Sequence, residues 1–275
     1  MHTSSLSIII TSYRNPELLK LCINSIKNNI AEDFNYEIIV ADSATEESTE
    51  MMMREDFPEV TFFGFEKNVG FQVVVNKGID NSKGDYLLIL NGDMLIKKHS
   101  VERLLDYLQS NPTVGIVGPK LLSFNGEFQY SCFRFYKPIT IIYRRTFFGK
   151  LGFAKKHLDK FLMKDYDHQR PIDVDWLMGS ALMMRADDLK KVGKLDPAFF
   201  MYMEDVDWCR RFWEKGLRVV YFPYAEMLHY HGKGSEKKGF ISSIFFNKLT
   251  WIHIASAIKY LKKYLGKPNP RKEYK

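Results

Sequence analysis

Short apolar runs alternate with amphipathic stretches along the first third of the chain. Leu6–Thr11, Tyr36–Ala41, Val60–Phe65 and Tyr86–Leu90 are predicted strands, and the unbroken apolar run of Tyr86–Leu90 predicts a strand that is buried on both faces. The stretches between them carry apolar residues at helical spacing. Because strand and helix alternate at this pace, we expect an α/β fold, with a mostly parallel, Rossmann-like central sheet and helices on both of its faces.

Residues that favour helix starts follow the first three strands. Asn15-Pro16-Glu17 places a capping side chain, a proline and an acid in the order that a helix N-terminus prefers. The next two helices are predicted over residues 45–54 and 68–81.

The regular alternation of strands and helices ends after the fourth strand. A helix is predicted over residues 101–110, a strand over 114–117 and a hairpin over 121–135. Residues 136–169 are basic, aromatic and irregular in pattern, and we expect an inserted, mobile segment near a binding site there. Further along, the pattern predicts a strand within 173–185, helices over 186–192 and 204–215, a strand over 217–222 and a long helix over 239–265.

The fourth strand stops abruptly at Asn91-Gly92-Asp93. A carboxylate just past the carboxyl end of a central parallel strand lies where open α/β sheets bind ligands, and Gly92 allows a sharp turn. We therefore interpret Asp93 as a ligand for a divalent metal that holds a diphosphate. The alternative is a simple turn.

Other polar residues are expected at the same edge of the sheet. Thr11, Asp42 and Asn68 follow strand ends or open helices, so they should converge on Asn91 and Asp93. Asp42 is suited to accept hydrogen bonds from a base or a ribose, and its alternative role is to cap the following helix.

An Asn inside a helix points to a further polar contact. Asn76 falls within the helix predicted over residues 68–81, where Asn has poor helix propensity.

Two later motifs carry further candidate chemistry. Trp176 with Gly179 close behind it indicates an aromatic platform for a sugar ring, although a Trp usually fills the core. Glu204 and Asp205 follow an apolar run, which is how a general base is held in a partly dry pocket. The alternative for these acids is stabilisation of a helix N-terminus.

A histidine after the last predicted strand offers a metal ligand. Neutral His229 can complete a metal shell with Asp93, although a lone His is more often a surface or core residue. Lys233, with the backbone amides of Gly232 and Gly234, is an alternative phosphate cradle.

The composition limits the class of protein, the charge of its partners and its cellular compartment. The 275 residues suit one large domain, and a hydrophobic content of 45% excludes disorder. A net charge of +7 favours an anionic partner. Cys22, Cys132 and Cys209 have no metal-binding spacing and indicate buried thiols in a reducing compartment. Without a signal peptide or a spanning stretch in this sequence, we expect a cytoplasmic protein, with peripheral attachment to the inner face of the plasma membrane as an alternative.

The predicted C-terminal helix is basic and amphipathic. Lys248, Lys259, Lys262 and Lys263 flank its apolar stripe. Such a helix lies in an anionic membrane interface or packs on its own domain or a second subunit, and the pattern does not separate these alternatives. The stripe consists of Phe240, Ile241, Ile244, Phe245, Leu249, Ile252, Ile258, Leu261 and Leu265.

Seven motifs in one order support a resemblance. Their sequences are SIIITSY up to Tyr13, VADSA over residues 40–44, NVGF over 68–71, LNGD up to Asp93, DWLMGSA from Asp175, FMYMEDVDWCR from Phe200 and HYHGKGS from His229. With these motifs the chain resembles family 2 glycosyltransferases of the glycosyltransferase A type, particularly the bacterial rhamnosyltransferase-like and galactofuranosyltransferase-like branch. The resemblance spans about residues 6–235.

The resemblance implies roles for the matching residues. It implies Asp205 as the catalytic base beside Glu204, with Mg²⁺ or Mn²⁺ on Asp93 and His229. Acceptor contacts are implied for Trp176 and Gly179. The implied nucleotide-sugar site consists of Thr11, Tyr13, Asp42, Asn68, Asn76, Asn91 and Asp93.

The implied activity is an inverting glycosyl transfer. A nucleotide-diphospho-sugar, dTDP- or UDP-linked and with dTDP-rhamnose as one candidate, would donate to a hydroxyl of a glycan or lipid-linked saccharide in cell-envelope polysaccharide synthesis. We expect a catalytic domain over 1–235, divided into a nucleotide-binding half (1–118) and an acceptor-binding half (119–235), and a basic helix and tail over 236–275. The sequence departs from the family at residues 72–75, where relatives carry small residues, and at Asn91, where many carry an acid.

Rival classes fit less well. A nucleotidyltransferase needs a basic, Gly-rich loop after the first strand, and a dehydrogenase needs Gly-x-Gly-x-x-Gly there, whereas residues 11–15 contain no glycine. The basic residues are not gathered with aromatics on a sheet, so no nucleic acid partner is expected. A sugar-nucleotide-binding protein without activity stays open as an alternative.

Overall fold

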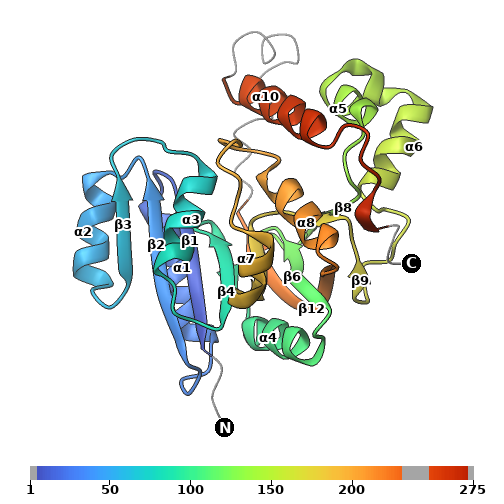
Figure 1. Cartoon of the computed structure of the whole chain (residues 1–275). Helices are drawn as coiled ribbons and strands as arrows, with labels where there is room; N and C mark the ends of the chain where they lie inside the picture. The colour runs from blue at the N-terminus through green and yellow to red at the C-terminus, as the bar shows by residue number, and fades with distance from the viewer. Residues whose placement is uncertain (1–4, 231–247, 272–275) are drawn as a thin grey trace.

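The computed structural model describes residues 5–230 and 248–271 (Figure 1). In these residues one sheet of ten strands runs in the order β3-β2-β1-β4-β11-β6-β12-β5, with β7 and β9 added beside β6 and β12. Its strands are β1 (Leu6–Ser12), β2 (Tyr36–Ser43), β3 (Thr61–Phe65), β4 (Tyr86–Asn91), β5 (Met94–Ile96), β6 (Val114–Leu122), β7 (Phe128–Gln129), β9 (Ile172–Asp173), β11 (Ala181–Arg185) and β12 (Arg218–His229). A separate pair joins β8 (Cys132–Phe133) to β10 (Trp176–Leu177).

Helices cover both faces of the sheet, as Figure 1 shows. They are α1 (Pro16–Asn29), α2 (Glu47–Asp56), α3 (Phe71–Asn81), α4 (Ser100–Ser110), α5 (Pro138–Arg145), the short 3-10 helix η1 (Phe147–Lys150), α6 (Gly152–Phe161), α7 (Ala186–Val192), α8 (Glu204–Glu214) and α10 (Lys248–Lys263).

The sheet confirms the predicted α/β pattern. Strands β3, β2, β1 and β4 are all parallel, and β4 is buried on both faces, with Leu87 to Leu90 at most 1% exposed. Beyond β4 the sheet becomes mixed, because β11 runs antiparallel between β4 and β6. One apolar cluster lies on each face of the sheet.

Two local predictions were wrong. Helix α2 begins at Glu47 rather than Thr45, because the Thr45 hydroxyl instead donates to the Asp42 carbonyl oxygen and accepts from the Phe65 amide, joining the ends of β2 and β3. The segment expected to be irregular, residues 136–169, contains α5, η1 and α6. Their pattern is hard to read because each is ten residues or shorter.

The C-terminal helix packs on its own domain, but only in part through the predicted stripe, of which Leu261 contacts the core. The start of the predicted helix lies outside the described residues. In α10 the buried side chains are His253, Ser256, Ala257 and Tyr260, whereas Ile258 of the predicted stripe is half-exposed. The buried face is held by polar contacts to the loop before α8, which an apolar pattern does not reveal.

None of the helices in the described part of the chain is both long and apolar enough to span a bilayer.

Candidate active site

A cavity of about 390 Å³ opens at the carboxyl edge of the parallel strands. It lies where β1, β2 and β4 end and where helices α1 and α3 begin, as the topology of an open parallel sheet predicts. Its lining residues are Thr11, Ser12, Tyr13, Asn15, Leu18, Ser43, Asn68, Gly70, Phe71, Val74, Asn91, Gly92, Asp93, Met201 and Tyr230.

The floor of the cavity is built by adjacent strand ends. The Thr11 hydroxyl donates to the Asn91 side-chain oxygen over 3.2 Å, and the Gly92 amide donates to the Thr11 carbonyl oxygen over 2.8 Å. A Cβ at Gly92 would lie 3.2 Å from that same oxygen, so the close approach favours glycine. These contacts leave Asp93 at the edge of the cavity, as predicted.

A second wall is formed around Asn68. Its side-chain oxygen accepts from the Gly70 amide over 3.0 Å, and the Ser43 hydroxyl approaches the same oxygen at 3.4 Å. The first helical residue of α3 is Phe71, so Asn68 organises the loop before the helix instead of capping it directly.

Asp42 lies beneath the surface of this wall. It is fully buried, does not line the cavity, and its carboxylate oxygens have no hydrogen-bond partner among the described residues. Burial raises the pKa of Asp42, and the nearby hydroxyls of Thr45 and Ser12 oppose that effect only in part. A ligand would reach Asp42 only if the wall opened.

Strand pairing brings His229 to Asp93. β12 pairs with β5 in antiparallel register, and the Tyr230 amide donates to the Asp93 carbonyl oxygen over 2.9 Å. His229 Nε2 then lies 3.6 Å from Asp93 Oδ1.

Gln129 sets the orientation of the His229 ring. Its amide oxygen lies 3.0 Å from His229 Nδ1, and its amide nitrogen donates to the His229 carbonyl oxygen. An amide oxygen only accepts, so in the neutral imidazole the proton sits on Nδ1 and the Nε2 lone pair faces Asp93. This donor set fits a divalent metal with two protein ligands and a partner that orients one of them. The described residues contain no group of three or more His, Cys, Asp and Glu side chains that could hold a metal ion, here or elsewhere.

Asp205 lies next to the cavity without lining it. It heads α8, and its Oδ2 accepts from the Gly179 amide over 3.1 Å. A Cβ at Gly179 would lie 3.7 Å from both this Oδ2 and the Phe71 ring, and Phe71 lines the cavity. Asp205 is therefore one residue layer from the cavity, on the side of Gly179 and Phe71.

Burial governs the ionisation of the two acids. Glu204 is 7% exposed and Asp205 is partly exposed. Burial raises the pKa of both carboxyl groups, and the charge of Asp205 raises the pKa of Glu204 further. Hydrogen bonds from the amides of Gly179 and Val206 favour the ionised form of Asp205. The pair thus shares one negative charge, placed on Asp205, at intermediate pH.

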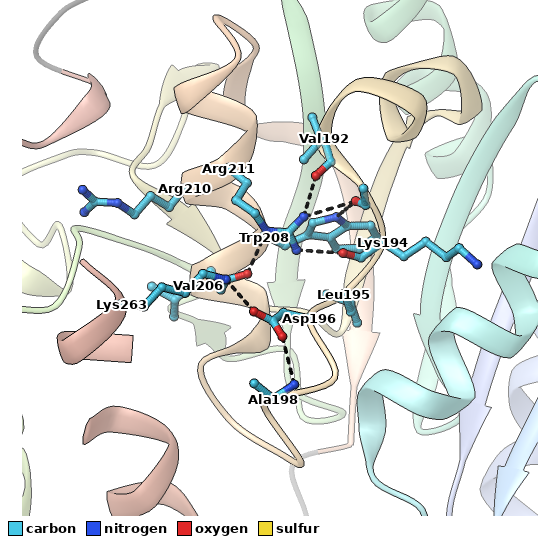
Figure 2. A network of polar contacts seen from close by, with 12 residues as sticks. Val192, Lys194, Leu195, Asp196, Ala198, Val206, Trp208, Arg210, Arg211 and Lys263 are labelled. Atoms are coloured by element: carbon cyan, nitrogen blue, oxygen red, sulfur yellow. Dashed lines mark hydrogen bonds and ion pairs between the residues drawn. The ribbon is translucent and has the colours of Figure 1, made fainter. Parts of the chain in front are cut away.

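The loop that precedes α8 is fixed by the helix itself. Figure 2 shows Arg211 and Trp208 reaching from α8 to this loop. Arg211 donates to the carbonyl oxygens of Val192 and Lys194 over 2.7 and 2.8 Å, and the Trp208 indole donates to the Gly193 carbonyl oxygen over 2.9 Å. These bonds set the start of the loop, which ends with Tyr202 and Met203 at positive φ angles of 68° and 70°. Such strained backbone persists only where its surroundings hold it.

The structure does not bring every predicted residue to the cavity. Asn76 binds the Leu195 backbone with both ends of its amide, so its polar contact is with the chain itself. Trp176 is 6% exposed, stacks on Phe133 at 4.3 Å and donates to the Arg134 carbonyl oxygen. This burial favours the alternative that Trp176 fills the core. The predicted contact between Trp176 and an acceptor sugar stays a prediction.

Several residues of the site were missed in the sequence. Gly70 has a φ of 89°, and a Cβ there would lie 2.5 Å from the Phe200 carbonyl oxygen. Ser43, Met201 and Tyr230 line the cavity, and Gln129 holds His229 from a strand of two residues. Gly70, Ser43, Met201 and Tyr230 each fall within one of the seven motifs, whereas nothing in the sequence marks Gln129. The phosphate cradle considered at residues 232–234 lies outside the described residues.

The departure at Gln72 has a structural explanation. Gln72 is buried and does not line the cavity. With its amide nitrogen toward the loop, it donates to the carbonyl oxygens of Phe199 and Phe200, each over 2.9 Å. The large side chain thus ties α3 to the loop before α8 and does not fill the donor pocket.

The chain is similar in sequence to known proteins of similar length. The chain is 24% identical over 277 residues to an N-acetylglucosaminyl-diphospho-decaprenol L-rhamnosyltransferase of Mycobacterium tuberculosis, covering 92% of this chain and 85% of the relative. It is 26% identical to the rhamnosyltransferase WbbL of Escherichia coli, covering 92% of this chain and 91% of the relative.

Solved structures show the same fold. The crystal structure of GalNAc-T7 with UDP, GalNAc and Mn²⁺ aligns with a TM-score of 0.64 at 15% identity, over 84% of this chain and 44% of that one. S. aureus TarS 1–349 aligns with a TM-score of 0.55 at 12% identity, over 82% of this chain and 60% of that one. Both are thus considerably longer than this chain, and they confirm the glycosyltransferase A-type fold.

The sequence profile of the family described as glycosyl transferase family 2 matches residues 7–193, which include β1 to β4, the cavity floor and Gly179. The chain therefore belongs to glycosyl transferase family 2.

Proposed function

We propose that the protein is an inverting, metal-dependent glycosyltransferase of cell-envelope polysaccharide synthesis. It moves a sugar from a nucleotide-diphospho-sugar to a hydroxyl of a glycan or lipid-linked saccharide. The observation that carries the proposal is the pairing of a cavity at the carboxyl edge of the sheet, lined by Thr11, Asn68 and Asp93 among others, with a carboxylate one layer away. The two rhamnosyltransferases among its relatives favour rhamnose as the sugar. The family resemblance makes dTDP one candidate for its carrier.

The nucleotide belongs at the β1 and β2 side of the cavity. Tyr13 is half-exposed beside it and offers a ring face to a base, while Asn68 and Ser43 offer hydrogen-bonding groups. Buried Asp42 behind them would accept hydrogen bonds from the base or the ribose once the wall opens. We assign this half to residues 1–118 and the acceptor half to residues 119–235.

The diphosphate belongs next to Asp93. Asp93 and His229 would hold Mg²⁺ or Mn²⁺, with Gln129 keeping the His229 lone pair directed toward the site. When bound, the metal neutralises the charge that the departing diphosphate carries.

Asp205 performs the proton transfer. Its carboxylate takes the proton from the acceptor hydroxyl as that oxygen attacks the anomeric carbon. The bond between the sugar and the diphosphate breaks on the opposite face, so the configuration is inverted. The Gly179 amide holds Asp205 Oδ2, and buried Glu204 stays protonated beside it.

A donor panel tests the proposal. dTDP-rhamnose, UDP-galactose and UDP-N-acetylglucosamine are incubated with the protein and a lipid-linked saccharide, and the released nucleoside diphosphate is measured with and without Mn²⁺. We expect release and a lengthened glycan with one donor, and loss of both after chelation. Tight binding of a sugar nucleotide without release would instead identify a binding protein, and turnover that resists chelation would remove the metal from the mechanism.

A further inference from the structure

Large apolar side chains are exposed together on α5, η1 and α6. Phe147 and Phe153 are 61% and 64% exposed, although both lie in helical segments. We call this surface the insert face, and it consists of Ile139, Ile142, Phe147, Phe148, Leu151 and Phe153. Six exposed large apolar residues within 15 positions form a concentration that usually marks a binding surface.

The opposite side of the same helices is well packed. Phe161 is 3% exposed and lies against Phe133 and Tyr136, and its carbonyl oxygen accepts from the Arg134 amide. Thr140 of α5 contacts His157 of α6 over 2.7 Å. The insert therefore has its own buried side, and the insert face is left over after folding.

The insert also carries most of the protein's net charge. Residues 136–169 contain eight Lys and Arg and three Asp, which is a net charge of +5. The whole chain has 40 basic and 33 acidic residues, so the remaining residues hold 32 basic and 30 acidic ones, a net charge of +2. Lys150, Lys155, Lys156 and Lys160 are exposed on the same short segment as the phenylalanines.

The insert lies at the end of the molecule where the cavity opens. Figure 1 shows α5, α6 and α10 in the upper part of the molecule. The carboxyl ends of β1 and β4 point toward this upper end, and the cavity lies at those ends. The insert and the cavity are therefore at the same end of the sheet.

We propose that the insert face docks on an anionic lipid bilayer, with its aromatic side chains in the interface and its lysines at the headgroups. Apolar side chains beside a cluster of lysines match the two properties of such a surface, an apolar interior and a negative headgroup layer. A protein partner would also cover the phenylalanines, but it would not need a net charge of +5 on one small insert. The proposal concerns a surface outside the active site and does not depend on which sugar is transferred.

Vesicle flotation of the full-length protein tests the proposal. Vesicles of phosphatidylglycerol mixed with phosphatidylcholine are compared with vesicles of phosphatidylcholine alone, at low and high salt. We expect binding to the anionic vesicles only, and weaker binding at high salt. The double variant Phe147→Ser/Phe153→Ser should lower the partition coefficient at least about tenfold. The triple variant Lys155→Gln/Lys156→Gln/Lys160→Gln should do the same, since each basic residue near the surface contributes.

Matched controls distinguish binding through the insert face from non-specific adsorption to the vesicles. Leu21→Ser/Met51→Ser removes two half-exposed apolar residues from α1 and α2, and Lys98→Gln/Lys215→Gln removes two exposed lysines elsewhere. Both controls should float like the unchanged protein. Thermal unfolding of every variant confirms that it is folded, and turnover of a soluble acceptor should be the same in all of them.

Three results would overturn the proposal. The first is an unchanged protein that does not bind anionic vesicles. The second is that test and control variants lose vesicle binding equally. The third is that Trp251→Ser, at an exposed site on α10, loses vesicle binding whereas the insert variants keep it. If the unchanged protein fails to float but self-associates through Phe147 and Phe153 in size-exclusion chromatography, the insert face is a protein interface instead.

Discussion

The two aspartates of the site are held in different ways. Asp93 lies in the two-residue turn between β4 and β5. The Gly92 amide donates to the Thr11 carbonyl oxygen of β1, and the Tyr230 amide donates to the carbonyl oxygen of Asp93 itself. Asp205 heads α8, and its position depends on contacts from separate parts of the chain. The Phe71 amide donates to the Phe200 carbonyl oxygen, and the Ser256 hydroxyl of α10 donates to the Met201 carbonyl oxygen over 2.8 Å.

This difference shows where the molecule tolerates change. The wall around Asp93 is built from strand ends whose register is set by a buried sheet. The wall around Asp205 is a strained loop held by side chains from α3, α8 and α10. We therefore expect changes on the first wall to alter ligand binding, and changes on the second to alter turnover or stability.

The largest effect is expected from Asp205→Asn. It removes the proposed base without changing its size, so kcat should fall by about 10²–10⁴-fold while the Kd of the sugar nucleotide stays nearly the same. Steady-state turnover and calorimetric titration measure the two quantities. Normal turnover would show that another group accepts the proton.

Gly70→Ala should destabilise the protein by about 3 kcal/mol. The new Cβ would meet the Phe200 carbonyl oxygen at 2.5 Å, at a φ of 89° that L residues avoid. Chemical denaturation measures the free energy of unfolding.

The matched control is Gly126→Ala, at a φ of 84° with nothing within 4 Å, which should cost only about 1 kcal/mol. Equal losses would mean that the contact between α3 and the loop contributes nothing.

Gln129→Leu should weaken Mn²⁺ binding by about 10–100-fold, because the His229 ring loses the partner that orients it. Titration of Mn²⁺ into the complex with nucleoside diphosphate measures the affinity. Gln169→Leu, at an exposed position, is the control and should bind Mn²⁺ normally. Unchanged affinity in Gln129→Leu would place the metal away from His229.

Tyr264→Phe should lower the free energy of unfolding by about 1.5 kcal/mol. The Tyr264 hydroxyl donates to buried Asp207 over 2.7 Å, and Arg211 and Lys263 remain as partners of that carboxylate. Donor affinity should not change, since this contact serves the Asp205 wall. Tyr224→Phe, at a half-exposed position, is the matched control. A weaker donor affinity would show that the two walls are coupled.

The smallest change is expected in the pH profile. As the proposed base, Asp205 would act when ionised, and burial raises its pKa above the ordinary range of an aspartate. The value of kcat/KM should therefore rise with pH through a limb that lies above about pH 4, the ordinary value, and then level off. A limb at the ordinary value would mean that water reaches Asp205 freely.

Local patterns predicted the donor side well. The apolar runs of β1 to β4 and the Asn15 cap of α1 each follow from residues close together in the chain. Asp93 at the cavity follows from the same reasoning. The helices of residues 138–161 were missed because short segments on the edge of a domain obtain their stability from packing that a local pattern does not show.

The apolar stripe did not correctly predict which face of α10 is buried. Side chains such as Ser256 and Tyr264 are buried because each finds a specific hydrogen-bond partner, on Met201 and Asp207. Polar burial of this kind depends on the position of the partner and leaves no hydrophobic periodicity.

By itself the sequence determined the alternation of strands and helices, the edge at which polar residues gather and the family to which the chain belongs. These follow from side chains that act on neighbours in the chain. Only the tertiary structure decided that β5 pairs with β12 and carries His229 to Asp93, that Trp176 lies in the core, and that the insert leaves phenylalanines exposed. Each of these depends on contacts between residues far apart in sequence, and such contacts are set when the whole core packs.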